Sequence, residues 1–293
     1  MNNKGVWAAI VAYALWGVLP IYWKAVQAAP AQEILGHRIV WSFVFLLGLL
    51  VGTRQVGLWL EAWNRPKILL TYLFSATLLS INWLTYIWGV NAGYIVDTSL
   101  GYFITPLLSV LLGVLFLHER LRPWQMVAVG LALIGVLYLT LSYSVVLWIP
   151  LTLAASFGLY GLLRKLTPLD ALVALSLETS LLFLPAALFL GARQIQGHAA
   201  FGNTGLSTTL LLIFSGVVTG LPLLLFGYGA RRITLVTLGI LQYIAPTLQF
   251  LIGVLIYKEA FNPTRLIGFS LIWAALLIYW VDGFRRMRRA ARV

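Results

Sequence analysis

The sequence predicts an all-α membrane protein with ten transmembrane helices, arranged as two inverted repeats of five helices with both termini in the cytoplasm. Three observations predict this fold: an apolar composition, ten apolar segments of membrane-spanning length, and a motif that recurs at an offset of 140 residues. The 293-residue chain is 61% hydrophobic and 10% charged, whereas soluble domains are roughly 45–50% apolar and about 25% charged. Folding buries only about 75% of the surface of a ~300-residue chain, so a soluble fold could not hide this much apolar surface. A soluble enzyme, a nucleic-acid-binding protein and a disordered chain are therefore excluded.

Ten segments are long enough to cross a membrane, which takes about 20 mostly apolar residues. They are 5–24, 34–52, 68–90, 96–117, 123–141, 145–163, 170–190, 207–229, 234–257 and 264–282. The charge-free stretch from Pro123 to Leu163 predicts a tight hairpin of two helices. The segment from Arg54 to Lys67, in which Trp59 and Trp63 lie among charged residues, is expected to rest at the membrane interface.

The positions of Lys and Arg predict the orientation. With the N-terminus inside, fifteen of the 20 fall in cytoplasmic segments and four in external ones, and Arg38 lies within a span. Cytoplasmic segments of membrane proteins are enriched in these residues. Five of them lie in the last nine residues, where they suit anionic lipid headgroups better than nucleic acid. The chain has no Cys, which removes disulfides and thiol chemistry.

An internal repeat divides the chain into residues 1–142 and residues 143–293, the second with the basic tail. At an offset of 140 residues, Pro106, Gly113, Glu119 and Pro123 align with Pro246, Gly253, Glu259 and Pro263. An offset of 141 places Lys24 on Lys165 and His37 on Glu178. Because each half holds an odd number of helices, the halves enter the membrane in opposite directions. Many secondary transporters use such inverted repeats and bind their cargo at midplane between them.

These features resemble the drug/metabolite transporter superfamily, EamA type. The stretch from Gly17 to Lys24, the run EILGHR from Glu33 to Arg38 and the stretch from Asn82 to Glu119 are similar to its RarD-like branch. The resemblance covers nearly the whole chain. It implies a bacterial inner-membrane permease, usually an exporter of metabolites or drugs, in a branch associated with chloramphenicol sensitivity. It implies no cofactor, and it leaves the cargo and the oligomeric state open.

Small and polar residues recur on matching faces of the fourth and ninth spans, which predicts a central cavity there. Pro106 and Gly113 in one span, and Pro246 and Gly253 in the other, are candidate hinge or packing positions. Proline frees a backbone carbonyl, which membrane helices tolerate only against protein or a water-filled cavity. Close packing between helices is the alternative explanation. The candidate cargo contacts on these and neighbouring helices are Tyr13, Trp16, Asn82, Tyr86, Tyr102, Ser109, Gln242, Tyr243 and Gln249.

Three ionisable residues lie within spans, where such groups are costly and suggest function. They are His37, Arg38 and Glu178. A buried carboxyl or an imidazole can take up and release a proton during transport. The alternative is a structural ion pair, for instance between Arg38 and Glu178. If Arg38 faced the cavity, it could meet a carboxylate of the cargo.

The sequence therefore predicts a secondary transporter of small metabolites, such as amino acids, or of amphiphilic drug-like molecules. It contains neither a phosphate-binding Gly-x4-Gly-Lys-Ser/Thr loop nor a His-Glu-x2-His metal motif, so ATP hydrolysis and metal catalysis are not expected. Two alternatives remain. An intramembrane serine protease would use Ser270 but needs a well-placed histidine base. A lipid scramblase would leave the paired polar faces without a role.

Overall fold

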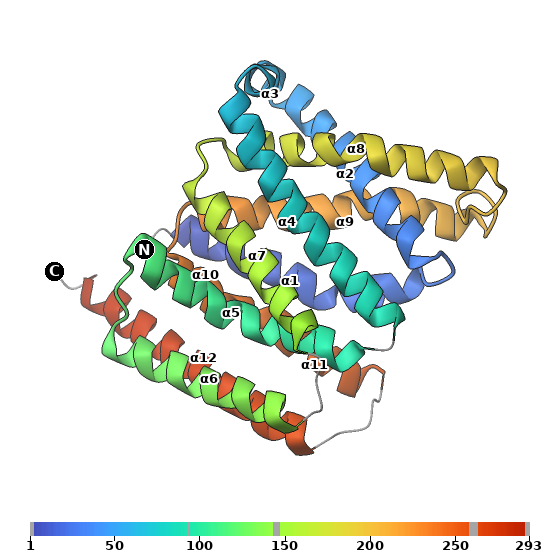
Figure 1. The fold of residues 1–293 in the computed structure, drawn as a ribbon. Coiled ribbons are helices and arrows are strands. Elements are labelled where there is room, and N and C mark those ends of the chain that lie inside the picture. Colours follow the sequence, from blue (N-terminus) through green and yellow to red (C-terminus); the bar gives the residue numbers. More distant parts are fainter. Residues whose placement is uncertain (1–2, 93, 143–146, 258–262, 291–293) are drawn as a thin grey trace.

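The computed structural model describes residues 3–92, 94–142, 147–257 and 263–290, and this part of the chain forms helices and no strands. The all-α prediction is therefore confirmed for the described residues. Figure 1 shows the helices packed side by side as a bundle. They are α1 (Asn3–Ala25), α2 (Ala31–Gly52), α3 (Val56–Trp63), α4 (Pro66–Asn91), α5 (Ile95–Leu117), α6 (Pro123–Ser142), α7 (Trp148–Leu166), α8 (Ala171–Ile195), α9 (Leu206–Ala230), α10 (Leu235–Gln242), α11 (Ile244–Leu255) and α12 (Pro263–Ala290).

Each of the ten predicted segments falls on a helix, and the ninth falls on two, α10 and α11. Among the described residues, eight spans are long and apolar enough to cross a membrane. The other two predicted segments lie on α7, which has Arg164 and Lys165 in its last turn, and on α12, whose apolar part is the shorter stretch Leu266–Asp282. The predicted interfacial segment contains α3, a short helix with Leu58 and Leu60 exposed, at one edge of the bundle (Figure 1).

Helices far apart in the sequence form the main contacts. α1 packs on α9 and α11, α2 packs on α8 and α9, and α7 lies between α4 and α5. α10 packs on α5. α6 and α12 lie side by side along the edge opposite α3 (Figure 1). A cluster of buried side chains that includes Tyr13, Tyr160, Phe226 and Leu235 joins α1, α7, α9 and α10 at the centre.

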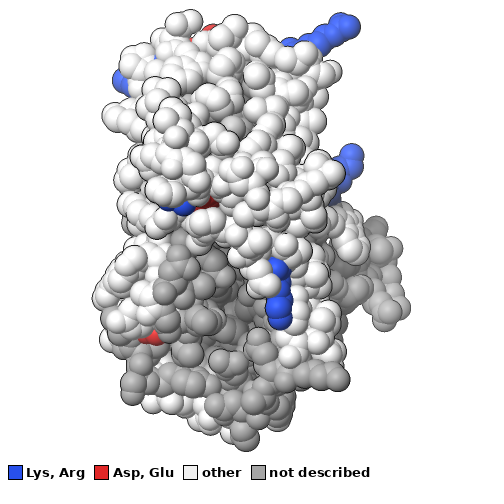
Figure 2. Space-filling model, turned by 90° about the vertical axis from the view of Figure 1, so that its right-hand side faces the viewer, with Lys and Arg blue, Asp and Glu red and all other residues white. Residues whose placement is uncertain are grey.

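The two ends of the bundle differ in charge. Ion pairs Glu61–Arg65, Arg122–Asp282, Glu119–Lys165 and Asp170–Arg231 lie toward the end where α1 begins. Figure 2 views the other end, where α1 leads into α2 and α8 leads into α9. On this face, the described Lys and Arg side chains are scattered, and the Glu33–Arg193 ion pair also lies at this end, between the start of α2 and the end of α8.

Glycines bring several helices into close contact. A Cβ at Gly216 of α9 would collide with the backbone carbonyl of Trp41 in α2, and a Cβ at Gly268 of α12 would collide with Leu139 of α6. Lipid tails are as apolar as Leu, so helices in a membrane associate largely through close packing of small residues. The absence of a side chain at Gly216 is therefore what allows α2 and α9 to approach each other.

We expect Gly216→Ala to destabilise the protein, because the new methyl group would meet the backbone of α2 rather than a movable side chain. Overpacking of this kind costs about 1–3 kcal/mol and outweighs the gain of up to ~1 kcal/mol in helix propensity. The measurement is the midpoint of thermal unfolding in detergent. Gly48→Ala is the matched control, since a Cβ there meets nothing within 4 Å. Equal midpoints for the two variants would contradict the prediction.

Candidate functional site: a central cavity closed at one end

A cavity of about 340 Å³ lies between the helices of the two halves of the chain. Small-molecule sites typically have volumes of about 300–1,000 Å³, so it is large enough for a small organic molecule. The first half lines it with Tyr13, Trp16, Leu19, Pro20, Trp23, Arg38, Asn82, Trp83, Tyr86 and Tyr102. The second half lines it with Phe157, Thr219, Leu223, Gln242, Ala245, Pro246 and Gln249.

Seven of the nine predicted cargo contacts line this cavity, and two do not. Ser109 is buried where α5 crosses α10, and its Cβ would lie 3.0 Å from a Cβ at Gly239. Tyr243 is buried in the apolar cluster between α5 and α12, and its hydroxyl donates to the carbonyl of Phe103 at 3.2 Å. Both are therefore packing residues here. Tyr102 therefore faces the cavity, whereas Ser109, two turns further along the same face of α5, packs against α10.

The amide side chains of the lining differ in their bonding. Asn82 donates to the Leu153 carbonyl at 2.9 Å and to Ser156 Oγ at 3.1 Å, which ties α4 to α7. Gln249 donates to the Trp16 carbonyl at 3.2 Å, which ties α11 to α1. Both amides hold helices together and also face the cavity. For Gln242, no hydrogen bond is recorded to any described residue.

Aromatic rings dominate the wall of the cavity. Seven of the seventeen lining residues are aromatic. Trp16 and Phe157 meet edge to face at 5.7 Å, and Tyr86 and Tyr102 do so at 5.6 Å. Such rings offer a large apolar contact area with few rotatable bonds. The wall is therefore suited to a cargo with a flat or apolar body.

Arg38 is the only charged residue among the described residues that line the cavity. Its Nε donates to Thr219 Oγ1 at 3.0 Å, and its Cζ lies 4.7 Å from the ring centroids of both Trp23 and Trp83. Three helices, α1, α4 and α9, thus hold the guanidinium in place.

Glu178 pairs with Arg164, not with Arg38. Glu178 Oε1 lies 3.6 Å from Arg164 Nη1, and both side chains are almost fully buried, at 0% and 1% exposure. Ser75 and Tyr160 donate to the same carboxylate at 2.6 and 3.2 Å. Breaking a buried ion pair leaves an uncompensated charge, so each partner requires the other. The pair joins α7 to α8, and neither residue lines the cavity.

His37 also lies outside the cavity, near the start of α2. Its ring stacks on Phe201 at 4.9 Å, and its Nδ1 accepts a hydrogen bond from Trp41 at 3.3 Å. One turn earlier, Glu33 accepts from Arg193 at 2.9 Å and from the Ala200 amide at 2.7 Å. These contacts connect α2 to α8 and to the segment that follows it.

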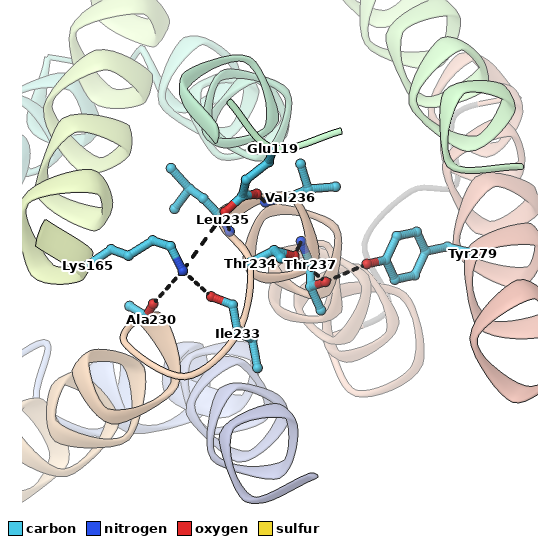
Figure 3. Close-up of polar contacts among 9 residues, drawn as sticks. All are labelled: Glu119, Lys165, Ala230, Ile233, Thr234, Leu235, Val236, Thr237 and Tyr279. Atoms are coloured by element: carbon cyan, nitrogen blue, oxygen red, sulfur yellow. Dashed lines mark hydrogen bonds and ion pairs between the residues drawn. The ribbon is translucent and has the colours of Figure 1, made fainter. Parts of the chain in front are cut away.

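At the end of the bundle where α1 begins lies a polar cluster, drawn in Figure 3. Both oxygens of Glu119, just beyond α5, accept from the first amides of α10, those of Leu235 at 2.7 Å and Val236 at 2.9 Å. The Lys165 ammonium donates to the Ile233 carbonyl at 2.5 Å and lies 3.9 Å from Glu119. A carboxylate at a helix N-terminus satisfies free amides and complements the helix dipole. We call Glu119, Lys165 and the segment 233–236 the inner lock.

The predicted hinge residues have different environments. The ninth span is interrupted at Tyr243, three residues before Pro246, which is consistent with proline's clash with the preceding turn. Pro106 lies inside the unbroken helix α5. A Cβ at Gly113 would lie 2.9 Å from Glu119 Oε2, so this glycine makes room for the inner lock. Gly253 lies in α11, and Glu259 lies outside the described residues.

Several residues of the site were not predicted. Arg164 lies one residue beyond the predicted span 145–163, although α7 continues past it to Leu166. Trp83 follows the predicted contact Asn82, and Thr219 lies in the eighth predicted span; the sequence pattern singles out neither residue. The alternative protease residue, Ser270, lies on the exposed face of α12. Among the described residues, no group of three or more His, Cys, Asp or Glu could hold a metal ion.

Comparisons with known proteins identify the family. Residues 3–141 match the EamA-like transporter family. The chain is 46% identical to the "Uncharacterized transporter YojE" of Bacillus subtilis, over 95% of this chain and 94% of that protein. It is also 46% identical to "Protein RarD" of Streptomyces exfoliatus, over 99% and 92% of the two chains. A solved crystal structure has the same fold, with a TM-score of 0.72 and 20% identity over 95% of this chain and 97% of that one.

The Bacillus subtilis relative is named as a transporter, and the similarity to both relatives extends over nearly the whole chain with identities well above 30%. The fold and the cavity are consistent with that assignment, and the protein is not an enzyme. The chain belongs to the drug/metabolite transporter superfamily, as an EamA-type, RarD-like membrane transporter.

Proposed function

We propose that the protein is a secondary transporter that exports small metabolites, such as amino acids, or amphiphilic drug-like molecules across the bacterial inner membrane by alternating access. The observation that carries this proposal is a cavity lined from both halves of the chain, with the inner lock joining α5, α7 and α10 toward the end where α1 begins. A carrier must expose its site to one side at a time. The structure then corresponds to a state closed toward the side where α1 begins.

We further propose ten spanning helices in two inverted repeats, residues 1–142 and 143–293. The packing supports this arrangement because contacts occur in matching pairs. If α1 corresponds to α7, α4 to α9 and α5 to α10 and α11, the contact of α1 with α9 matches that of α7 with α4. The contact of α5 with α7 likewise matches that of α11 with α1. Tyr243 also bonds to Phe103, the residue 140 positions before it, as residues beside a two-fold axis would.

The distribution of charge supports an orientation with both termini in the cytoplasm. Arg54, Arg120, Arg231 and Lys165 all lie toward the end where α1 begins and α12 ends (Figure 1). Cytoplasmic segments are enriched in Lys and Arg. In this orientation the inner lock faces the cytoplasm, and the basic tail meets anionic lipid.

Proton coupling through Glu178 has little support in the geometry. The carboxylate is committed to Arg164, Ser75 and Tyr160, and it lies outside the cavity. We therefore propose that Glu178 is structural and that the cargo gradient drives transport.

Counterflow in proteoliposomes tests the transporter function. We expect saturable exchange of at least one compound from a panel of amino acids, organic acids, their amides and chloramphenicol. No exchange of any compound, combined with movement of fluorescent lipid, would favour the scramblase alternative.

A lumenal pH dye tests coupling in the same vesicles. Arg164→Met/Glu178→Leu removes the buried pair and should exchange cargo without altering the wild-type pH signal. Loss of a wild-type pH signal in this variant would show that Glu178 takes part in coupling.

The stability of single and double variants tests the structural role of the buried pair. We expect Arg164→Met and Glu178→Leu each to cost about 3–5 kcal/mol, because each leaves one buried charge unpaired. The double variant should cost much less than the sum, since no charge remains in the apolar interior. Thermal unfolding in detergent measures all three. Additive losses would show that the two residues do not depend on each other.

Breaking the inner lock should shift the protein toward a state that is open on the cytoplasmic side. Glu119→Gln replaces a charged acceptor of two amide hydrogen bonds, each worth about 1.5–3 kcal/mol. The wild-type chain contains no Cys, so Ile233→Cys, at a buried position within the lock, supplies a single reporter. We expect Glu119→Gln to raise its labelling rate by maleimide at least fivefold. Glu61→Gln, in an exposed pair on α3, is the control. Equal rates in the two backgrounds would contradict the role of the lock.

A further inference from the structure

The positive charge in the cavity has no counter-charge within the described part of the chain. Six acidic residues form ion pairs there, and their partners are Arg65, Arg122, Arg164, Lys165, Arg193 and Arg231. Arg38 is in none of these pairs. Isolated charges inside a protein are costly unless they are paired or hydrated. The cavity thus keeps one net positive charge at a fixed position.

The contacts of Arg38 hold the guanidinium but do not neutralise it. The group has five N–H donors, and the structure records one hydrogen bond, from Nε to Thr219. Its Nη1 and Nη2 atoms have no acceptor among the described residues. Trp23 and Trp83 interact with the cation through their rings, an attraction that carries no negative charge. Two donor nitrogens therefore remain available to a molecule in the cavity.

We propose that Arg38 is the carboxylate-binding group of the transport site, and that the cargo is an organic monoanion with an aromatic or apolar body. This inference rests on the proposed transporter function and specifies its cargo. Arginine matches a carboxylate with two parallel hydrogen bonds. A single positive charge balances one negative charge, so a phosphate dianion or a dicarboxylate would leave an excess charge.

The rest of the lining defines the other parts of the cargo. Rings of Tyr13, Trp16 and Phe157 supply an apolar wall, and Gln242 supplies an amide with no partner among the described residues. No carboxylate lies among the described lining residues, so a free ammonium on the cargo would find no counter-charge. An acid whose amine is absent or acylated therefore fits better than a zwitterion.

A pair of compounds that differ only in the carboxylate tests this inference. N-acetyl-L-tryptophan is an anion, and N-acetyl-L-tryptophanamide is its neutral analogue with the same ring. Indole-3-acetate and indole-3-acetamide form a second pair. Binding to the purified protein in nanodiscs is measured for wild type, Arg38→Gln, Arg38→Lys and the control Arg65→Gln, which alters an exposed cation on the segment between α3 and α4.

We expect wild type and Arg65→Gln to bind each acid at least ~10-fold tighter than its amide, which corresponds to ~1.4 kcal/mol. Arg38→Gln should lose this preference, and Arg38→Lys should retain part of it. If Arg38→Gln fails to fold, the Arg38→Lys ratio and the wild-type ratio still decide the question.

Three results would overturn the inference: equal wild-type affinity for acid and amide, an undiminished preference in both Arg38 variants, or no binding by any acid. Exchange of a neutral compound such as chloramphenicol that is unchanged in Arg38→Gln would also overturn it, while the proposed transporter function would stand. Absence of all counterflow in wild type would overturn the transporter function. The ratio of the affinities for acid and amide comes from binding in nanodiscs, so it does not depend on that result.

Discussion

The bundle depends on helices approaching one another without the hydrophobic driving force that stabilises a soluble core. In a bilayer, apolar surface gains little by moving from lipid to protein, so close packing and interhelical hydrogen bonds must supply the association. Gly216 against Trp41 and Gly268 against Leu139 provide the close packing. Asn82, Gln249 and Tyr243 provide hydrogen bonds between helices. This need for interhelical hydrogen bonds explains why the amides of Asn82 and Gln249, which face the cavity, also donate to backbone carbonyls of neighbouring helices.

Charged groups lie in three environments: the ends of the bundle, its interior and the cavity. Their partners differ from one environment to the next. At the ends of the bundle, pairs such as Glu119–Lys165 and Asp170–Arg231 join loops and helix termini. In the interior, Arg164 and Glu178 compensate each other within a shell of hydroxyl groups. In the cavity, Arg38 is compensated only by rings and a hydroxyl among the described residues. Only the last environment is left able to respond to a bound molecule.

Much of the fold could be predicted from the sequence because helix length and apolar runs are local properties. The helices fall on the ten predicted segments, and the face containing Tyr102, Gln242 and Gln249 lines a cavity. The interruption at Tyr243 was not predicted, since the apolar pattern runs through it and Pro106 leaves its own helix unbroken. Ser109 and Tyr243 share a helix face with cavity residues, but crossing helices cover them. The partner of Glu178 depends on how α7 and α8 pack, which no local pattern specifies.

The hydrogen bond between Tyr243 and Phe103 has a consequence for how two similar halves become one protein. Under the proposed repeat these residues are equivalents that meet near the axis. In a symmetric dimer of identical halves, both positions would hold the same side chain: two phenylalanines would provide no hydroxyl, and two tyrosines would bring a second hydroxyl into the same apolar cluster. A single hydroxyl that donates to a backbone carbonyl therefore requires halves that differ in sequence. A single chain that contains both halves permits this difference. The contact at Tyr243 and Phe103 then forms between the first half and the second, and not between two copies of the same half.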